Sequence, residues 1–142
     1  MLGLNLASNT STEYCQTVDA GETWRAFVPL LGNDAGNADS VKIEAEFSQD
    51  APSVPDGVTV EESSLSGGDT DEVISTGVAK NGTDSELRYL ESISKLYAGD
   101  VLIGTSYTNL TGLPAGETWE FENTLLRRHE PEITKQEIVL ST

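Results

Sequence analysis

Short alternating apolar runs, separated at close intervals by turn-forming residues, constrain the fold of this chain more than any other feature. The clearest run is VKIEAEF at Val41–Phe47, in which apolar side chains fall on one face and Lys42, Glu44 and Glu46 on the other. A period of two is typical of a half-buried antiparallel strand. No stretch keeps a helical period, so the sequence predicts an all-β protein.

Six further strands are predicted by the same pattern in the rest of the chain. The first is short and lies inside a connection rich in Pro and Gly, residues 51–71. The predicted strands fall within residues 57–62, 71–80, 88–97, 100–110, 117–126 and 135–141. Strands of this length and spacing are typical of two antiparallel sheets packed face to face.

A repeated pentapeptide indicates a partial internal duplication. AGETW occurs at residues 20–24 and again at 115–119, an offset of 95 positions, and a Leu-Leu pair follows each copy at the same offset. The N-terminal copy has no counterpart of the first strands of the second copy. We therefore expect residues 1–50 to form a partial first repeat of about three strands, 51–71 to connect, and 72–142 to complete a sandwich.

The second AGETW copy also predicts local structure. Pro114 precedes Gly116, a combination that favours a tight turn into the next strand. Trp119 and Phe121 share a face with Asn123, so the two aromatic rings are predicted to fill the core between the sheets. Trp24 is expected to do the same in the first copy, in preference to forming a ligand platform with Trp119.

The charge balance narrows the partners. Acidic residues number 24 and basic residues 8, which gives a formal net charge of −16 and a pI near 4.1. This sign disfavours nucleic acid and anionic membrane surfaces, and no apolar run is long enough for membrane insertion. Because the carboxylates are spread along the chain, we expect a halophilic protein, in preference to a moderately acidic mesophilic one. Salt at molar concentration screens such repulsion beyond about 3 Å.

The residue inventory excludes most catalytic chemistry. Cys15 is the only cysteine and His129 the only histidine, so a Cys or Ser triad and a zinc site have too few members. Phosphate-loop and dinucleotide motifs are absent from the sequence, and the many carboxylates single out no glycosidase pair. The sequence therefore predicts no enzyme and no cofactor.

One metal candidate remains in a loop. GGDTDE places Asp69, Asp71 and Glu72 close together, and NDAGNAD at residues 33–39 is a second acidic loop. Calcium prefers such oxygen ligands, although neither loop has the order of an EF-hand. The favoured alternative is a solvated loop.

Two surface features suggest contacts or modification. Arg127, Arg128 and His129 form the basic cluster of the chain, which either docks an acidic partner surface such as a second copy or makes exposed ion pairs. Asn81 and Asn109 lie in sequons and are glycosylation candidates if the protein is exported.

The second half of the chain resembles the FxLyD domain family. The resemblance rests on a Gly-x-Val strand end, a Leu-Tyr pair and a Leu-x-x-Gly-Glu turn before an aromatic strand, while Ser94 and Ala98 stand where the family has Phe and Asp. The matching residues are Gly77, Val78, Asn81, Leu96, Tyr97, Leu113, Ala115, Gly116, Glu117 and Phe121. The resemblance implies a small immunoglobulin-like sandwich, common in exported proteins of halophilic archaea, with no catalytic residues.

These observations lead to one expected architecture and function. We expect an immunoglobulin-like antiparallel β-sandwich whose N-terminal repeat adds strands to it or exchanges them with a neighbour through strand pairing. The leading hypothesis is a non-catalytic binding or structural module of the archaeal cell envelope. The alternatives are a soluble domain that binds a small ligand or calcium and, third, a hydrolase that uses carboxylates. A cytoplasmic location is expected if the N-terminus as written is native.

Overall fold

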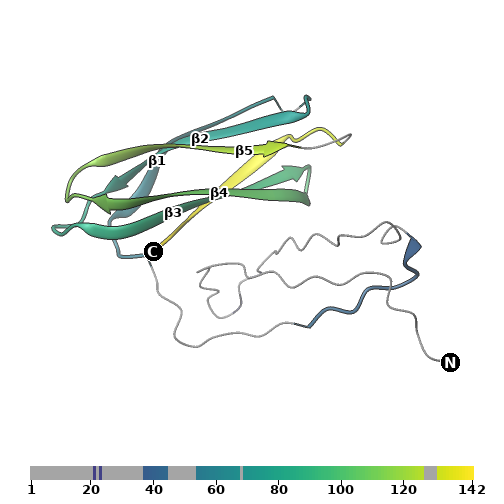
Figure 1. Ribbon diagram of the computed structural model, residues 1–142, viewed down its shortest axis with the longest axis horizontal. Coiled ribbons are helices and arrows are strands. Elements are labelled where there is room, and N and C mark those ends of the chain that lie inside the picture. The colour runs from purple at the N-terminus through teal and green to yellow at the C-terminus, as the bar shows by residue number, and fades with distance from the viewer. Residues whose placement is uncertain (1–20, 22, 24–36, 45–53, 68, 127–130) are drawn as a thin grey trace.

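The computed structural model describes residues 21, 23, 37–44, 54–67, 69–126 and 131–142 (Figure 1). Within these residues the chain forms six strands and no helix. Each strand overlaps one of the six predicted for residues 57–141, which confirms the all-β prediction. The strands are β1 (Val58–Ser66), β2 (Glu72–Asn81), β3 (Leu87–Ala98), β4 (Val101–Leu113), β5 (Thr118–Leu126) and β6 (Lys135–Ser141).

The strands form two antiparallel sheets that lie in separate layers (Figure 1). The first sheet has the order β1-β2-β5 and the second has the order β4-β3-β6. The chain passes from one sheet to the other after β2, returns after β4 and crosses again after β5. This alternation buries the inner faces of both sheets against each other, as in a β-sandwich.

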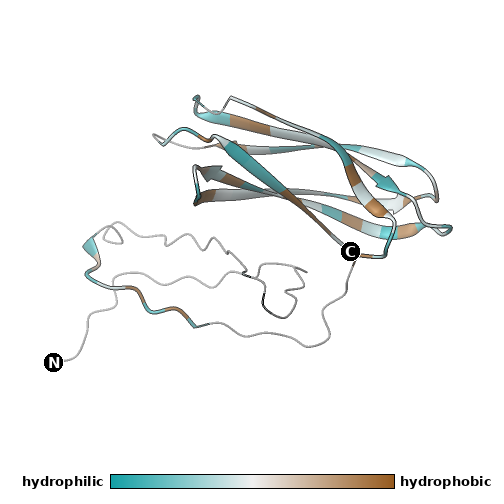
Figure 2. Ribbon diagram, turned by 180° about the vertical axis from the view of Figure 1, so that it is seen from behind, coloured by the Kyte–Doolittle hydropathy of each residue, from teal (hydrophilic) through white to brown (hydrophobic). Residues whose placement is uncertain are grey.

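Alternation along the strands places apolar residues between the layers, and Figure 2 shows brown and teal bands following one another along the ribbons. In β2 every second residue from Val73 to Asn81 is buried. The pairing of β1 with β2 shifts register between Val60 and Glu62, which marks a β-bulge. Because of the extra residue, Val60 and Leu65 face the same side.

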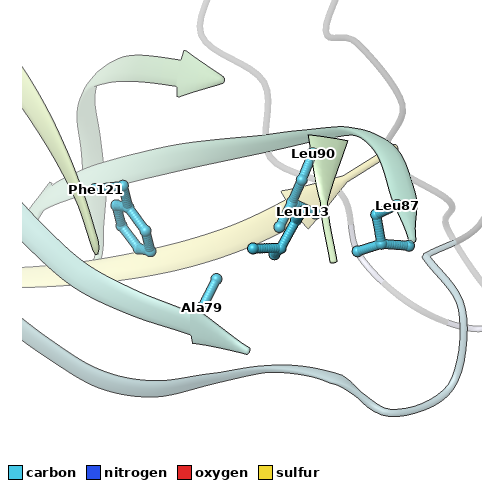
Figure 3. Packing of buried hydrophobic residues seen from close by; sticks show 5 residues of the cluster. All are labelled: Ala79, Leu87, Leu90, Leu113 and Phe121. Atoms are coloured by element: carbon cyan, nitrogen blue, oxygen red, sulfur yellow. The ribbon is translucent and has the colours of Figure 1, made fainter. Parts of the chain in front are cut away.

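The apolar interior consists of two clusters. The first contains Ala79, Leu87, Leu90, Leu113 and Phe121, whose side chains converge in Figure 3. The second contains Val73, Leu96 and Ile133. Each cluster joins residues from both sheets, so the packing between the layers depends on both.

The aromatic residues of the second AGETW copy lie where the sequence predicted. Phe121 is buried, Trp119 packs against the first cluster, and their ring centroids are 5.3 Å apart. The amide of Glu117 donates a hydrogen bond to the carbonyl of Pro114 at 3.2 Å, which closes the predicted turn. Gly116 has a φ of 77° and its counterpart Gly21 a φ of 84°, a conformation that favours glycine.

The strand predicted at Val41–Phe47 is absent from its described part. Residues 41–44 have no strand pairing, and Val41 and Ile43 are 63% and 83% exposed. An alternating pattern forms a strand only where a partner strand takes up its backbone hydrogen bonds, so the prediction for residues 41–44 was wrong. Residues 45–47, Trp24 and the other expected strands of the first repeat lie outside the described residues.

Gly77 makes room for the largest ring of the core. It pairs with Phe121 in the sheet, and a Cβ at position 77 would overlap the Phe121 ring. We expect Gly77→Ala to lower the free energy of unfolding by about 1–3 kcal/mol, because the added methyl group overpacks the site. Urea denaturation measures the change.

Phe121→Leu provides the control for this prediction. The double variant should lose less stability than the sum of the two single variants, because the smaller side chain leaves space for the methyl group. Additive losses would show that Gly77 matters for a reason other than the ring.

Candidate functional site

A layer of polar side chains lies in the interior of the sandwich. Ser75 of β2 and Ser94 of β3 have their Oγ atoms 2.7 Å apart. The side-chain amide of Asn123 in β5 donates to Ser94 Oγ at 2.7 Å and to Ser92 Oγ at 3.1 Å. We call Ser75, Ser92, Ser94 and Asn123 the polar layer. Its hydrogen bonds connect the β1-β2-β5 sheet to the β4-β3-β6 sheet.

The polar layer is structural rather than reactive in its chemistry. Its members are at most 1% exposed, so solvent and substrates do not reach them. Hydroxyl and amide groups do not titrate near neutral pH, and a serine becomes a nucleophile only beside a general base. Asn123 Oδ1 is buried without a hydrogen-bond partner. Satisfying the other polar atoms of the layer offsets the cost of burying them.

Asn81 holds two loops at one end of the sandwich. Its side-chain nitrogen donates to the carbonyls of Ser85 at 2.8 Å, Leu113 at 3.0 Å and Pro114 at 3.1 Å. Its Oδ1 accepts hydrogen bonds from the backbone amide of Thr83 at 3.1 Å and from the Thr83 hydroxyl at 2.6 Å. The residue is completely buried. A glycan on Asn81 is incompatible with this arrangement, which corrects the prediction made from the sequon.

Asn109, the other glycosylation candidate, has different surroundings. It is exposed on β4 and stands in register with Glu91 of β3. Its sequon therefore lies in a strand and remains accessible. Glycosylation at Asn109 stays a prediction.

A groove crosses the outer face of the β1-β2-β5 sheet. Two cross-strand rows form it, one from Glu62 through Val78 to Glu120 and one from Ser64 through Thr76 to Glu122. We call this hollow of about 490 Å³ the Thr76 groove. The Oγ of Ser64 and the Oγ1 of Thr76 are 2.7 Å apart on its floor. Carboxylates and hydroxyls of this kind can accept hydrogen bonds from a partner that carries hydroxyl or amine groups.

The loop that carries the calcium candidates is organised by Thr70. The Thr70 hydroxyl lies 2.9 Å from the carbonyl oxygen of Gly67 and 2.7 Å from that of Glu72. Asp69, Asp71 and Glu72 are exposed. The structure does not bring them together, and in the described ranges no group of three or more His, Cys, Asp or Glu side chains is placed to hold a metal ion.

Several candidate residues lie outside the described residues. These are Cys15, Trp24, Arg127, Arg128, His129 and part of the acidic loop at residues 33–39. In the part of the chain that the structure describes, no helix has the length and apolar character needed to cross a bilayer.

Comparisons with known proteins identify no family for the chain. No family model matches it, and neither the characterised proteins nor the solved structures include a match.

Two features of the interior were not predicted from the sequence. The roles of Asn81 and of the polar layer depend on which strands face each other, and strand periodicity alone does not give that information. The signal was present in part, because Asn123 shares the predicted core face of Trp119 and Phe121. A polar residue on a core face indicates a buried hydrogen bond.

The two sequon asparagines give a matched test of these roles. We expect Asn81→Ala to lower the free energy of unfolding by about 2–3 kcal/mol, because it leaves the buried carbonyls of Leu113 and Pro114 without a donor. Asn109→Ala should change it by less than about 0.5 kcal/mol, since that side chain is exposed. Urea denaturation of both variants measures the difference, and equal losses would contradict the role of Asn81.

Proposed function

We propose that the protein is a non-catalytic binding or structural module. The observation that supports this function best is the distribution of its polar groups. Serine and asparagine side chains are used inside the sandwich as links between the sheets, whereas carboxylates are spread over the surface. An enzyme of this class would instead need a reactive group that touches a substrate in a concave site.

The module is proposed to be immunoglobulin-like. In such folds the third strand of the chain is central to one sheet and the second strand is central to the other. The orders β1-β2-β5 and β4-β3-β6 agree with that arrangement. The residues that carry the FxLyD resemblance have structural positions here, since Leu96, Tyr97 and Leu113 are buried and Gly116 lies in a turn. These positions support a family defined by its scaffold.

The surface supports a halophilic origin, which belongs to the same proposal. Among the acidic residues that the structure describes, only Glu91 is buried. Exposed carboxylates repel one another strongly in dilute buffer, and concentrated salt screens this repulsion. A location in the envelope of a halophilic archaeon agrees with this surface and with the FxLyD resemblance.

The Thr76 groove is the face that we propose for partner contact. It lies on the outer side of β2, away from the polar layer, and combines three carboxylates with a flat floor of Thr76 and Val78. A partner would therefore bind through hydroxyl or amine donors. No observation favours the calcium alternative, since Asp69, Asp71 and Glu72 do not converge.

Location in the cell provides the direct test of the proposed function. Antibodies against the full chain should detect it in the envelope fraction or on the surface of the source cells. Detection in the cytosolic fraction alone would contradict an envelope module. A catalytic role would be indicated by a turnover assay whose rate falls when Glu62 and Glu120 are changed to Gln without loss of folding.

Salt dependence tests the halophilic part of the proposal. We expect the melting temperature to rise by several degrees between about 0.1 M and about 2 M KCl, because screening removes the repulsion between surface carboxylates. The triple variant Glu62→Gln, Glu120→Gln and Glu122→Gln should show a smaller rise. Thermal unfolding followed by circular dichroism measures both, and an equal rise in the two proteins would indicate a general salt effect on the apolar core.

A further inference from the structure

The central strand β3 is buried on both of its faces. Its outward side chains Glu91, Ile93, Lys95 and Tyr97 are 6%, 8%, 2% and 2% exposed. In β2, the central strand of the other sheet, the outward side chains from Ile74 to Lys80 all remain partly exposed. The outer face of an antiparallel sheet in a two-layer protein is ordinarily solvated. The outer face of the β4-β3-β6 sheet therefore differs from that of its partner sheet.

The described strands do not account for this burial. Beside β3 lie β4 and β6, and β5 packs across its inner face. None of the six strands lies on its outer face. Tyr107 of β4, in register with Ile93, is 69% exposed, whereas Ser141 of β6, in register with Glu91, is fully buried. The buried part of the face thus covers β3 and the end of β6 and stops before the outer part of β4.

The burial includes charged groups, which makes an accidental contact unfavourable. The Tyr89 hydroxyl donates to the Glu91 carboxylate at 2.8 Å, and the Nζ of Lys135 lies 5.0 Å from the centre of the Tyr97 ring. Charged groups are buried in proteins only where hydrogen bonds and opposite charges compensate them. A specific segment of protein is needed to cover such a face.

Charge and chain length favour one occupant, the N-terminal part of this chain. Residues 1–53 contain two basic and eight acidic residues, a net charge of −6. The β4-β3-β6 sheet presents Lys95 and Lys135 on its outer face, whereas the Thr76 groove presents three carboxylates. An acidic segment is attracted to the first face and repelled by the second. A length of 53 residues is also enough to cover two strands.

We propose that residues 1–53 dock on the outer face of the β4-β3-β6 sheet, over β3 and β6. Tyr107 and Val101, both exposed, lie beyond the edge of this contact. The first repeat is then held by the complete sandwich of the same chain. The Thr76 groove, on the opposite side of the molecule, stays free for a partner. This inference does not depend on what the partner is.

Ile93→Lys and Tyr107→Lys form the matched pair that tests the proposal in the full chain. The two residues stand in register on adjacent strands, but only Ile93 is buried. Hydrogen exchange followed by mass spectrometry reports on peptides from residues 1–53. We expect Ile93→Lys to speed their exchange about tenfold or more, as for the loss of a buried aliphatic contact, while β1, β2 and β5 stay protected. Tyr107→Lys should leave it unchanged, and equal exchange in both variants would overturn the proposal.

A photo-crosslinking residue provides a second test that needs no destabilising change. p-Benzoylphenylalanine at position 139, which is partly exposed and in register with Ile93, should crosslink to peptides from residues 1–53. The same residue at position 107 should not. Crosslinks from position 139 to other parts of the chain would overturn the proposal. Crosslinking that rises with protein concentration would also overturn it, because a second copy would then cover the face.

Discussion

The hydrogen bonds between Asn123 of β5 and the serines of β3 fix how the two sheets face each other. Apolar side chains alone tolerate sliding of one layer over the other, because dispersion contacts have little directional preference. The amide of Asn123 reaches Ser92 and Ser94 only in one alignment. The two apolar clusters, one toward Phe121 and one toward Ile133, then fill the space on either side of this alignment.

The positions of the strands could be predicted from the sequence, but their partners could not. Alternation and turn residues located all six strands between residues 57 and 141 because both are local properties. Sheet order depends on contacts between distant segments, such as β2 with β5 and β3 with β6. The segment at residues 41–44 shows the limit of the local argument, since it alternates as clearly as any strand and yet has no partner in the described part of the chain.

The candidate site was predicted less well for the same reason. Asn81 matches a glycosylation sequon, and only the fold shows that its amide donates to three carbonyls. Asp69, Asp71 and Glu72 are close in sequence, but the turn around Thr70 leaves their side chains apart in solvent. Spacing along a chain indicates a binding site only where the backbone also brings the side chains to one point.

The bulge in β1 gives this strand an unequal tolerance to change. Glu61 is the additional residue, and its exposed carboxylate lies 3.5 Å from the Nζ of Lys80. Many side chains would serve at that position. Deletion of the residue, however, would reverse the inward and outward faces for half of the strand and turn either Val60 or Leu65 toward water. Evolution can therefore vary the composition of β1 freely at this point but can hardly alter its length.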